Sequence, residues 1–426
     1  MTQLTGRILL LLDQVVFSLA NFALTIILAR MYSTTEFGAY GIALSIVLVV
    51  QFIQRSLYVV SLSLMSKRRA ARYLPAILAE HLLVAGIALL GVALWVGLTL
   101  LRRDVHVPDL AMSTLVCTAI YFQADFDRAL LVKRGTFAGA LVLSILYLVA
   151  VLVLGWLAKR AQMSYEEFML LLAMCCVARG LWLLTLRAAP RWGWGLRLLA
   201  ADWRRYGWPS VMQASTSLGT QHAPIFILSA LRGSAAVAGL VAMRSLTQPL
   251  MLVTRSLDAA DKNRFREDTK GGTASLRRVF WRTAALYAAI GVGAIVVLSA
   301  FPETIISIAY HGKYIGYGWV MISWGVYSTL LGLNFPVQSV VYVLHRQGAF
   351  ARLTVLNACV GTGLAILLCP RMGVAGAIIA IVASMATFVG GGFAICRDVL
   401  LGRSDGPLPK EGRVSRSTVA EKRSAA

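Results

Sequence analysis

Three arginines lie within strongly apolar stretches of the sequence, where a charged side chain is costly. They are Arg55, Arg244 and Arg255, and an unpaired guanidinium at the centre of a membrane helix costs at least about 2.5 to 3.5 kcal/mol. A guanidinium binds phosphate or carboxylate through two parallel hydrogen bonds, so these residues predict a site for an anionic ligand. As simpler alternatives, Arg55 and Arg255 could extend to lipid headgroups, and Arg244 could pair with Asp13 or with another buried carboxylate.

Uncharged polar side chains recur at helical spacing in five apolar segments. Polar faces inside a bilayer must meet water or one another, so we expect them to surround a water-filled cavity together with the three arginines. The polar residues expected to bind substrate there are Asn21, Gln51, Gln213, Gln221 and Gln248. For each of them, the alternative is an ordinary hydrogen bond between helices, worth roughly 0.6 kcal/mol.

Four ionisable residues could couple transport to an ion. Asp13 and Glu80 lie inside apolar segments and Asp125 lies near the end of one; carboxylates in such places can bind H⁺ or Na⁺. His222 could titrate near neutral pH. The alternatives are helix capping or an ion pair with Arg128 for Asp125, and a histidine satisfied by hydrogen bonds for His222.

The sequence contains no motif typical of a hydrolase, a nucleotide-binding protein or a metalloprotein. It lacks G-x-S-x-G, the Walker A loop and H-E-x-x-H, and its six cysteines show no metal-ligand spacing with the five histidines. We therefore predict no catalytic residues, no metal site and no cofactor, and we expect this chain not to be an enzyme. Without a P-loop, transport by this chain would not be driven directly by ATP.

Apolar helices must position these side chains. The 426 residues are 58% hydrophobic and 14% charged, whereas soluble domains carry roughly 25% charged residues. Runs of about 20 apolar residues, enough to cross a bilayer, recur along nearly the whole length. The predicted spans are 8–29, 37–58, 76–101, 110–130, 137–157, 167–186, 209–231, 235–257, 279–301, 318–343, 351–369 and 373–396. The predicted fold is all-α, a polytopic membrane protein with about twelve spans in two six-helix lobes around a central cavity.

The formal net charge of +22 reports orientation in the membrane. With the N-terminus inside, most Lys and Arg residues fall in the inner loops, so the positive-inside rule places both termini in the cytoplasm. The same charge attracts anionic lipids of the inner leaflet. We therefore expect no nucleic-acid partner.

A segment rich in tryptophan and arginine, 191–208, divides the helices into two groups. Its composition is typical of a segment that lies in the headgroup region. We predict an N-terminal lobe over 1–190, this interfacial cytoplasmic linker, a C-terminal lobe over 209–397 and a disordered cytoplasmic tail over 398–426. When the two lobes are aligned at an offset of 201 residues, three residues of the first match identical residues of the second: Ala29, Ser33 and Gly38 with Ala230, Ser234 and Gly239. These matches suggest a weak internal repeat.

Three stretches carry turn motifs between predicted helices. They are Leu28-Ala-Arg-Met-Tyr-Ser-Thr-Thr-Glu-Phe-Gly-Ala-Tyr-Gly41, Ala235 to Pro249, and Pro370-Arg-Met-Gly-Val-Ala-Gly-Ala377. These stretches, and their order along the chain, resemble the turns of Wzx-type polysaccharide and O-antigen flippases. Those flippases are a polysaccharide transporter family of the multidrug/oligosaccharidyl-lipid/polysaccharide (MOP) superfamily. The first resembles the family's A-R-x-L followed by an acidic-Phe-Gly turn.

The resemblance implies lobes that open alternately inward and outward. The implied cargo is an oligosaccharide repeat unit on undecaprenyl pyrophosphate, crossing the bacterial inner membrane for O-antigen or exopolysaccharide synthesis, with a polysaccharide polymerase and glycosyltransferases as partners. Arg55, Arg244 and Arg255 would then hold the pyrophosphate or acidic sugars. One alternative is a drug or cation antiporter of the same superfamily, which would favour several acidic groups in its cavity. Another is a membrane polysaccharide polymerase, which would display a large outer loop that this sequence lacks.

Overall fold

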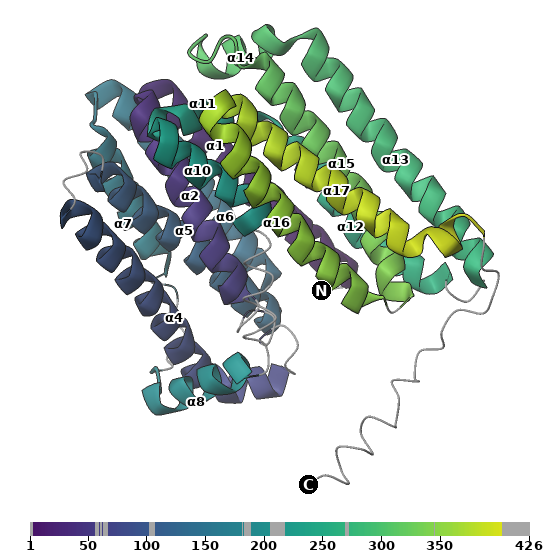
Figure 1. Cartoon of the computed structure of the whole chain (residues 1–426). Coiled ribbons are helices and arrows are strands. Elements are labelled where there is room, and N and C mark those ends of the chain that lie inside the picture. Colours follow the sequence, from purple (N-terminus) through teal and green to yellow (C-terminus); the bar gives the residue numbers. More distant parts are fainter. Residues whose placement is uncertain are drawn as a thin grey trace.

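The computed structural model of the chain is a bundle of helices (Figure 1). It describes residues 3–55, 59, 62, 67–101, 107–180, 182, 189–204, 218–268, 272–344 and 346–402, and these residues contain no β-strand. The helices up to residue 204 are α1 (Gln3–Met31), α2 (Thr34–Gln54), α4 (Lys67–Leu101), α5 (Val107–Arg134), α6 (Phe137–Ala161), α7 (Tyr165–Gly180) and α8 (Trp192–Asp202). The later ones are η4 (Leu218–His222), α10 (Ala223–Arg232), α11 (Ser234–Leu246), α12 (Gln248–Asp268), α13 (Gly272–Ala300), α14 (Pro302–Tyr310), α15 (Gly318–Val343), α16 (Gln347–Met372) and α17 (Val374–Leu400).

Most of the predicted membrane spans are present as long helices. In the described part of the chain, eight helices are long and apolar enough to cross a membrane, and the pair α11 and α12 makes a ninth span if it is counted as one. The described residues of the other three predicted spans fall in α5, in α7 and in η4 with α10, while 181, 183–186 and 209–217 lie outside the described residues. The chain is therefore a polytopic all-α membrane protein, as the sequence predicts.

The predicted span 235–257 is not one straight helix. α11 and α12 meet at Thr247 with their axes 48° apart. Pro249 explains this break, because proline has no backbone N–H and its ring clashes with the carbonyl four residues earlier, that of Ser245. Arg244 and Gln248 therefore lie on opposite sides of a bend rather than on one continuous polar face.

The turn between α1 and α2 is encoded locally. Ser33 accepts a hydrogen bond from the backbone N–H of Glu36, and the Glu36 carboxylate accepts one from the backbone N–H of Ser33. This reciprocal capping box satisfies backbone donors that a helix start leaves free. It starts α2 after only two residues, Tyr32 and Ser33, that follow the end of α1.

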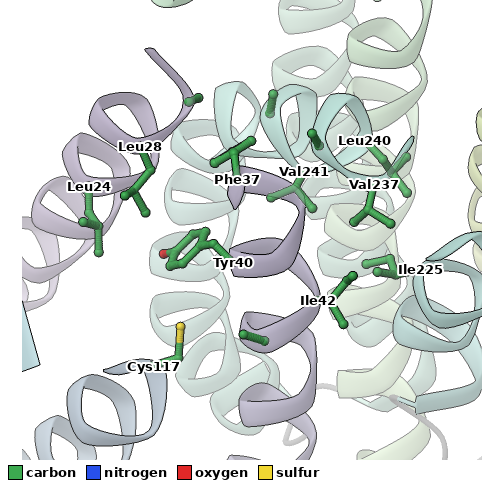
Figure 2. Close-up of a cluster of buried hydrophobic side chains, with 14 of the residues drawn as sticks. Leu24, Leu28, Phe37, Tyr40, Ile42, Cys117, Ile225, Val237, Leu240 and Val241 are labelled. Carbon is green, nitrogen blue, oxygen red and sulfur yellow. The ribbon is translucent and has the colours of Figure 1, made fainter. Parts of the chain in front are cut away.

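Helix α2 connects the two groups of helices. The helices before α8 pack mainly among themselves, as do those after it, and the closest contact between the groups is that of α2 with α11. Figure 2 shows Phe37 and Tyr40 of α2 between Leu28 of α1 and Val241 of α11, in one buried apolar cluster. Burial of such side chains and their close packing stabilise this seam.

The short helix α8 lies within the predicted linker 191–208. In Figure 1 it crosses the lower end of the bundle, the end opposite α14. The Arg191 backbone N–H donates to the Pro75 carbonyl of α4 at 3.0 Å. A Cβ on Gly195 would lie 2.6 Å from the Ala79 Cβ, so only glycine allows α8 to lie this close to α4.

The first residues of the predicted tail belong to a helix. α17 continues to Leu400, and Arg346 Nη1 and Nη2 donate to the two carboxylate oxygens of Asp398 at 2.6 and 2.5 Å. This ion pair ties the last turn of α17 to the turn before α16, so residues 398–400 are helical. Residues 403–426 lie outside the described part of the chain.

Candidate functional site

The three arginines singled out by the sequence lie near one another. Arg55 follows α2, Arg244 lies in the last turn of α11 and Arg255 lies on α12. The charge of Arg255 is close enough to interact with that of Arg244 and with that of Arg55. Because α2 belongs to one group of helices and α11 and α12 to the other, these like charges gather where the groups face each other. Such a cluster favours an anion among its members.

Arg244 is the most enclosed member of this cluster. It is half-buried, whereas Arg55 and Arg255 are exposed, and its guanidinium carbon lies 5.4 Å from the ring centre of Trp324 on α15. Trp324 is fully buried and its Nε1 donates to the Leu240 carbonyl at 3.0 Å, so the ring is held in place beneath the cation. Among the described residues, neither Arg244 nor Arg255 forms an ion pair.

Arg55 is oriented by a carboxylate behind it. Its Nε donates to Asp125 Oδ2 at 2.5 Å and its Nη2 donates to Asp125 Oδ1 at 2.9 Å, a bidentate pair. The Gln51 side-chain amide also donates to Asp125 Oδ2, at 2.7 Å. Asp125 is 7% exposed and the Arg55 side chain 49%, so the carboxylate is enclosed while the guanidinium faces outward. Asp125 thus pairs with Arg55, and not with Arg128 as the alternative expected.

Asp13 is paired within the N-terminal group. Its Oδ2 accepts from Arg128 Nε at 2.6 Å and its Oδ1 accepts from Ser144 Oγ at 2.5 Å. Asp13 is buried, and both of its oxygens are engaged. The alternative in which Asp13 neutralises Arg244 is therefore wrong for this structure.

Asn21 makes an ordinary bond between helices. Its Oδ1 accepts from the Tyr147 hydroxyl at 3.1 Å, and its Nδ2 donates to the Phe17 carbonyl at 3.0 Å. These contacts fit the packing interpretation of Asn21. Gln221 in η4 and Gln248 at the start of α12 are half-buried, and the predicted residue Gln213 lies outside the described residues.

Glu80 and His222 are buried in different surroundings. Glu80 lies where α4 meets α8, next to Asp202, and its Oε1 has no hydrogen-bond partner among the described residues. His222 lies within electrostatic reach of Arg244, and no described residue forms a hydrogen bond with its Nδ1. The structure therefore brings His222, and not Glu80, to the arginine cluster.

Aromatic residues of the site escape sequence reasoning. Trp324, Tyr327 and Tyr121 lie near Arg244, and the buried Tyr327 hydroxyl has no hydrogen-bond partner in the described part of the chain. In an apolar run these residues look like ordinary lipid-facing or core side chains. The available signal is the spacing of Trp324 and Tyr327 by three, which puts two aromatic groups with polar atoms on one helix face.

Comparisons with known proteins give a fold. No family model and no curated protein matches the sequence. Solved structures do match. The lipid II flippase MurJ in its inward closed conformation has a TM-score of 0.70 and 13% identity over 92% of this chain and 90% of that chain.

Two multidrug transporter structures add to this comparison. The inward-facing conformation of a MATE family transporter of the MOP superfamily has a TM-score of 0.67 and 14% identity over 92% of this chain and 96% of that one. An outward-facing MATE conformation has a TM-score of 0.57 and 15% identity over 93% of this chain and 95% of that one. The chain shares their fold. At such identities it is the helix arrangement that is common, and it is one used by flippases and transporters.

Proposed function

We propose that this protein is a flippase that carries a lipid-linked oligosaccharide across the bacterial inner membrane by alternating access, for synthesis of a surface polysaccharide such as O-antigen or exopolysaccharide. The observation that carries this proposal is the cluster of Arg55, Arg244 and Arg255 between the two groups of helices. The expected cargo is an oligosaccharide repeat unit on undecaprenyl pyrophosphate. The flippase fold supports the same conclusion.

A pyrophosphate matches the cluster in charge and geometry. Arg244 is half-buried on an aromatic ring and has no carboxylate among the described residues, so it is oriented but not neutralised. Arg255 on α12 is exposed, and its charge lies close enough to interact with that of Arg55. Guanidinium groups bind phosphate oxygens through paired hydrogen bonds, and a diphosphate can engage more than one of them.

A drug or cation antiporter is the alternative, because MATE transporters have the same fold. A cation site needs carboxylates that are free to bind it, yet Arg128 occupies Asp13 and Arg55 occupies Asp125. Under either function, Glu80 and His222 are the remaining candidates for binding a coupling ion. The similar structures named above give the polymerase alternative no support.

The proposed location follows from the charged ends of the helices. Both termini would lie in the cytoplasm, with α8 in the headgroup layer of the inner leaflet. Trp192, Trp194 and Trp203 are about half exposed, and arginines flank them. Exposed tryptophans and cations suit contact with anionic lipid headgroups. A polysaccharide polymerase and glycosyltransferases are the proposed protein partners.

The decisive experiment follows the lipid-linked sugar in cells that lack the gene. A membrane-impermeant sugar label reports which leaflet holds the undecaprenyl-linked intermediate. Complementation uses the parent chain, Arg244→Ala, and the matched control Arg352→Ala, which removes an exposed arginine of α16. We expect the intermediate to accumulate on the inner face in the deletion and in Arg244→Ala, but not in Arg352→Ala, at equal protein levels.

Other outcomes would redirect the assignment. If the intermediate reaches the outer face and stays unpolymerised, the polymerase alternative replaces the flippase. If glycans are normal in the deletion while drug resistance falls, the antiporter becomes the function. If Arg244→Ala restores normal flipping, the arginine cluster is not the cargo site.

A further inference from the structure

Arg30 joins the two groups of helices at the end of the bundle that the sequence places outside. It lies in the last turn of α1. Its Nε donates to the Ala309 carbonyl and its Nη2 donates to the Ile308 carbonyl, both at 2.5 Å. These two carbonyls belong to the last turn of α14, where a helix has no backbone donors of its own for its carbonyl oxygens. A cation there also interacts favourably with the helix dipole.

Lys313 makes the reverse connection. It follows α14, and its Nζ donates to the Ala29 carbonyl at 3.0 Å and also to the Tyr32 carbonyl. Those carbonyls stand at the end of α1. Each group of helices therefore supplies one cation to the C-terminal carbonyls of a helix in the other group, and the two connections lie side by side.

A tight helix seam continues inward from these cations. A Cβ on Gly38 of α2 would lie 1.9 Å from the Ser234 carbonyl oxygen at the start of α11, and one on Gly41 would lie 2.6 Å from Val241 Cγ2. Val241 is 5% exposed, and Figure 2 places it in the apolar cluster between the helices. The seam is closed at this end, so any path to the outside must open here.

The two cations differ from the seam in their surroundings. Arg30 and Lys313 are both exposed, so water can replace their hydrogen bonds and salt can screen their charges. Their contacts are individually weak and reversible. Such contacts can hold a gate closed without preventing it from opening.

We infer that Arg30 and Lys313 form a reciprocal latch that favours the closed state of the outer gate, and that the gate opens when both cations leave the opposing helix ends. The inference rests on the alternating access of the proposed function, but it requires no particular cargo. It assigns to these residues a conformational role separate from that of the arginine cluster.

The test measures access to the seam from outside. Val241→Cys is introduced, and whole cells are treated with a membrane-impermeant thiol reagent, with labelling of the parent chain subtracted because it holds six cysteines. Arg30→Gln and Lys313→Met are added singly and together. We expect the double variant to be labelled about tenfold faster, and each single variant to a smaller extent. High salt should accelerate labelling of the Val241→Cys protein that keeps Arg30 and Lys313, but not of the double variant.

Two further variants make the result decisive. Lys159→Met removes an exposed cation of α6 that lines a hollow of about 530 Å³ together with Arg30. Among the described residues, the Lys159 side chain makes no bond to the other group of helices. Labelling of this variant should therefore be unchanged. Gly38→Ala wedges the seam open and should raise labelling. If Gly38→Ala raises labelling while the double variant does not, the latch is wrong, whatever the cargo. A working latch in a protein that flips no lipid would instead overturn the proposed function alone.

Discussion

The Asp125 carboxylate accepts both hydrogen bonds of the Arg55 guanidinium, across 70 residues of sequence and between α2 and α5. The carboxylate is almost fully enclosed, while half of the arginine side chain remains exposed. One edge of the guanidinium is thus held by the protein and the rest is presented outward. Asp125 therefore fixes the orientation of one cation of the arginine cluster.

Asp125→Asn should impair transport more than stability. Because the Arg55 side chain is half exposed, water can solvate its charge when the carboxylate is lost. An ion pair open to solvent contributes roughly 0 to 1 kcal/mol to folding, so the melting temperature should change little. Loss of the fixed orientation of Arg55 should lower flipping by about tenfold. Flipping in proteoliposomes and thermal unfolding of the same preparation measure the two effects. Glu166→Gln, at an exposed carboxylate of α7, is the control, and full flipping by Asp125→Asn would contradict the positioning role.

Asp13→Ala should destabilise the group of helices before α8. Arg128 would lose its carboxylate while its side chain remains 20% exposed, and breaking a buried ion pair at one partner costs about 3 kcal/mol or more. Asp13→Ala with Arg128→Met removes both charges and should recover much of that loss. Thermal unfolding of the single and double variants forms the cycle. If the double variant is as unstable as the sum of the single variants, the two residues do not act as a pair.

Gly195→Ala should loosen α8 from α4. The new Cβ would lie 2.6 Å from the Ala79 Cβ and 3.1 Å from the Glu80 backbone nitrogen, so the helices must separate. Gly193 is the matched control, since a Cβ there meets nothing within 4 Å, and alanine is the better helix former by roughly 0.5 to 1 kcal/mol. We expect Gly193→Ala to keep or raise the melting temperature and Gly195→Ala to lower it. Equal melting temperatures would show that α8 is not held by this contact.

Pro249→Ala should straighten the bend between α11 and α12. The new backbone N–H can donate to the Ser245 carbonyl, which the proline ring otherwise excludes. The expected result is a protein that is at least as stable but flips more slowly, because Arg244 and Arg255 would move relative to one another. Distances between spin labels on α11 and α12 report the straightening. Pro370→Ala, at an exposed proline of α16, should change neither the bend nor transport.

Several features of the fold could be read from local sequence. The apolar spans follow from the bilayer, since a segment that crosses it must be apolar and satisfy its backbone internally. The start of α2 follows from Ser33 and Glu36, whose side chains reach only their own helix end. The bend at Thr247 also had a local signal in Pro249, which the continuous hydropathy of the span concealed.

The site was predictable in composition but not in partners. The cost of a guanidinium in apolar surroundings singles out Arg244 and Arg55 from sequence alone. It does not decide which carboxylate each arginine meets, because Asp125 and Asp13 are equally plausible by residue type. Nor does it separate Asn21, which bonds to Tyr147, from a residue facing a cavity.

What the sequence by itself determined is that this chain crosses a membrane many times and carries arginines in apolar segments, where a charge is costly. Both properties depend on single segments and their transfer from water to lipid. The tertiary structure alone decided that Arg128 satisfies Asp13, that Trp324 supports Arg244, and that Arg30 and Ala309, 279 residues apart, meet at one end. Such contacts join helices distant in sequence, and their geometry is set by how whole helices pack rather than by any local pattern.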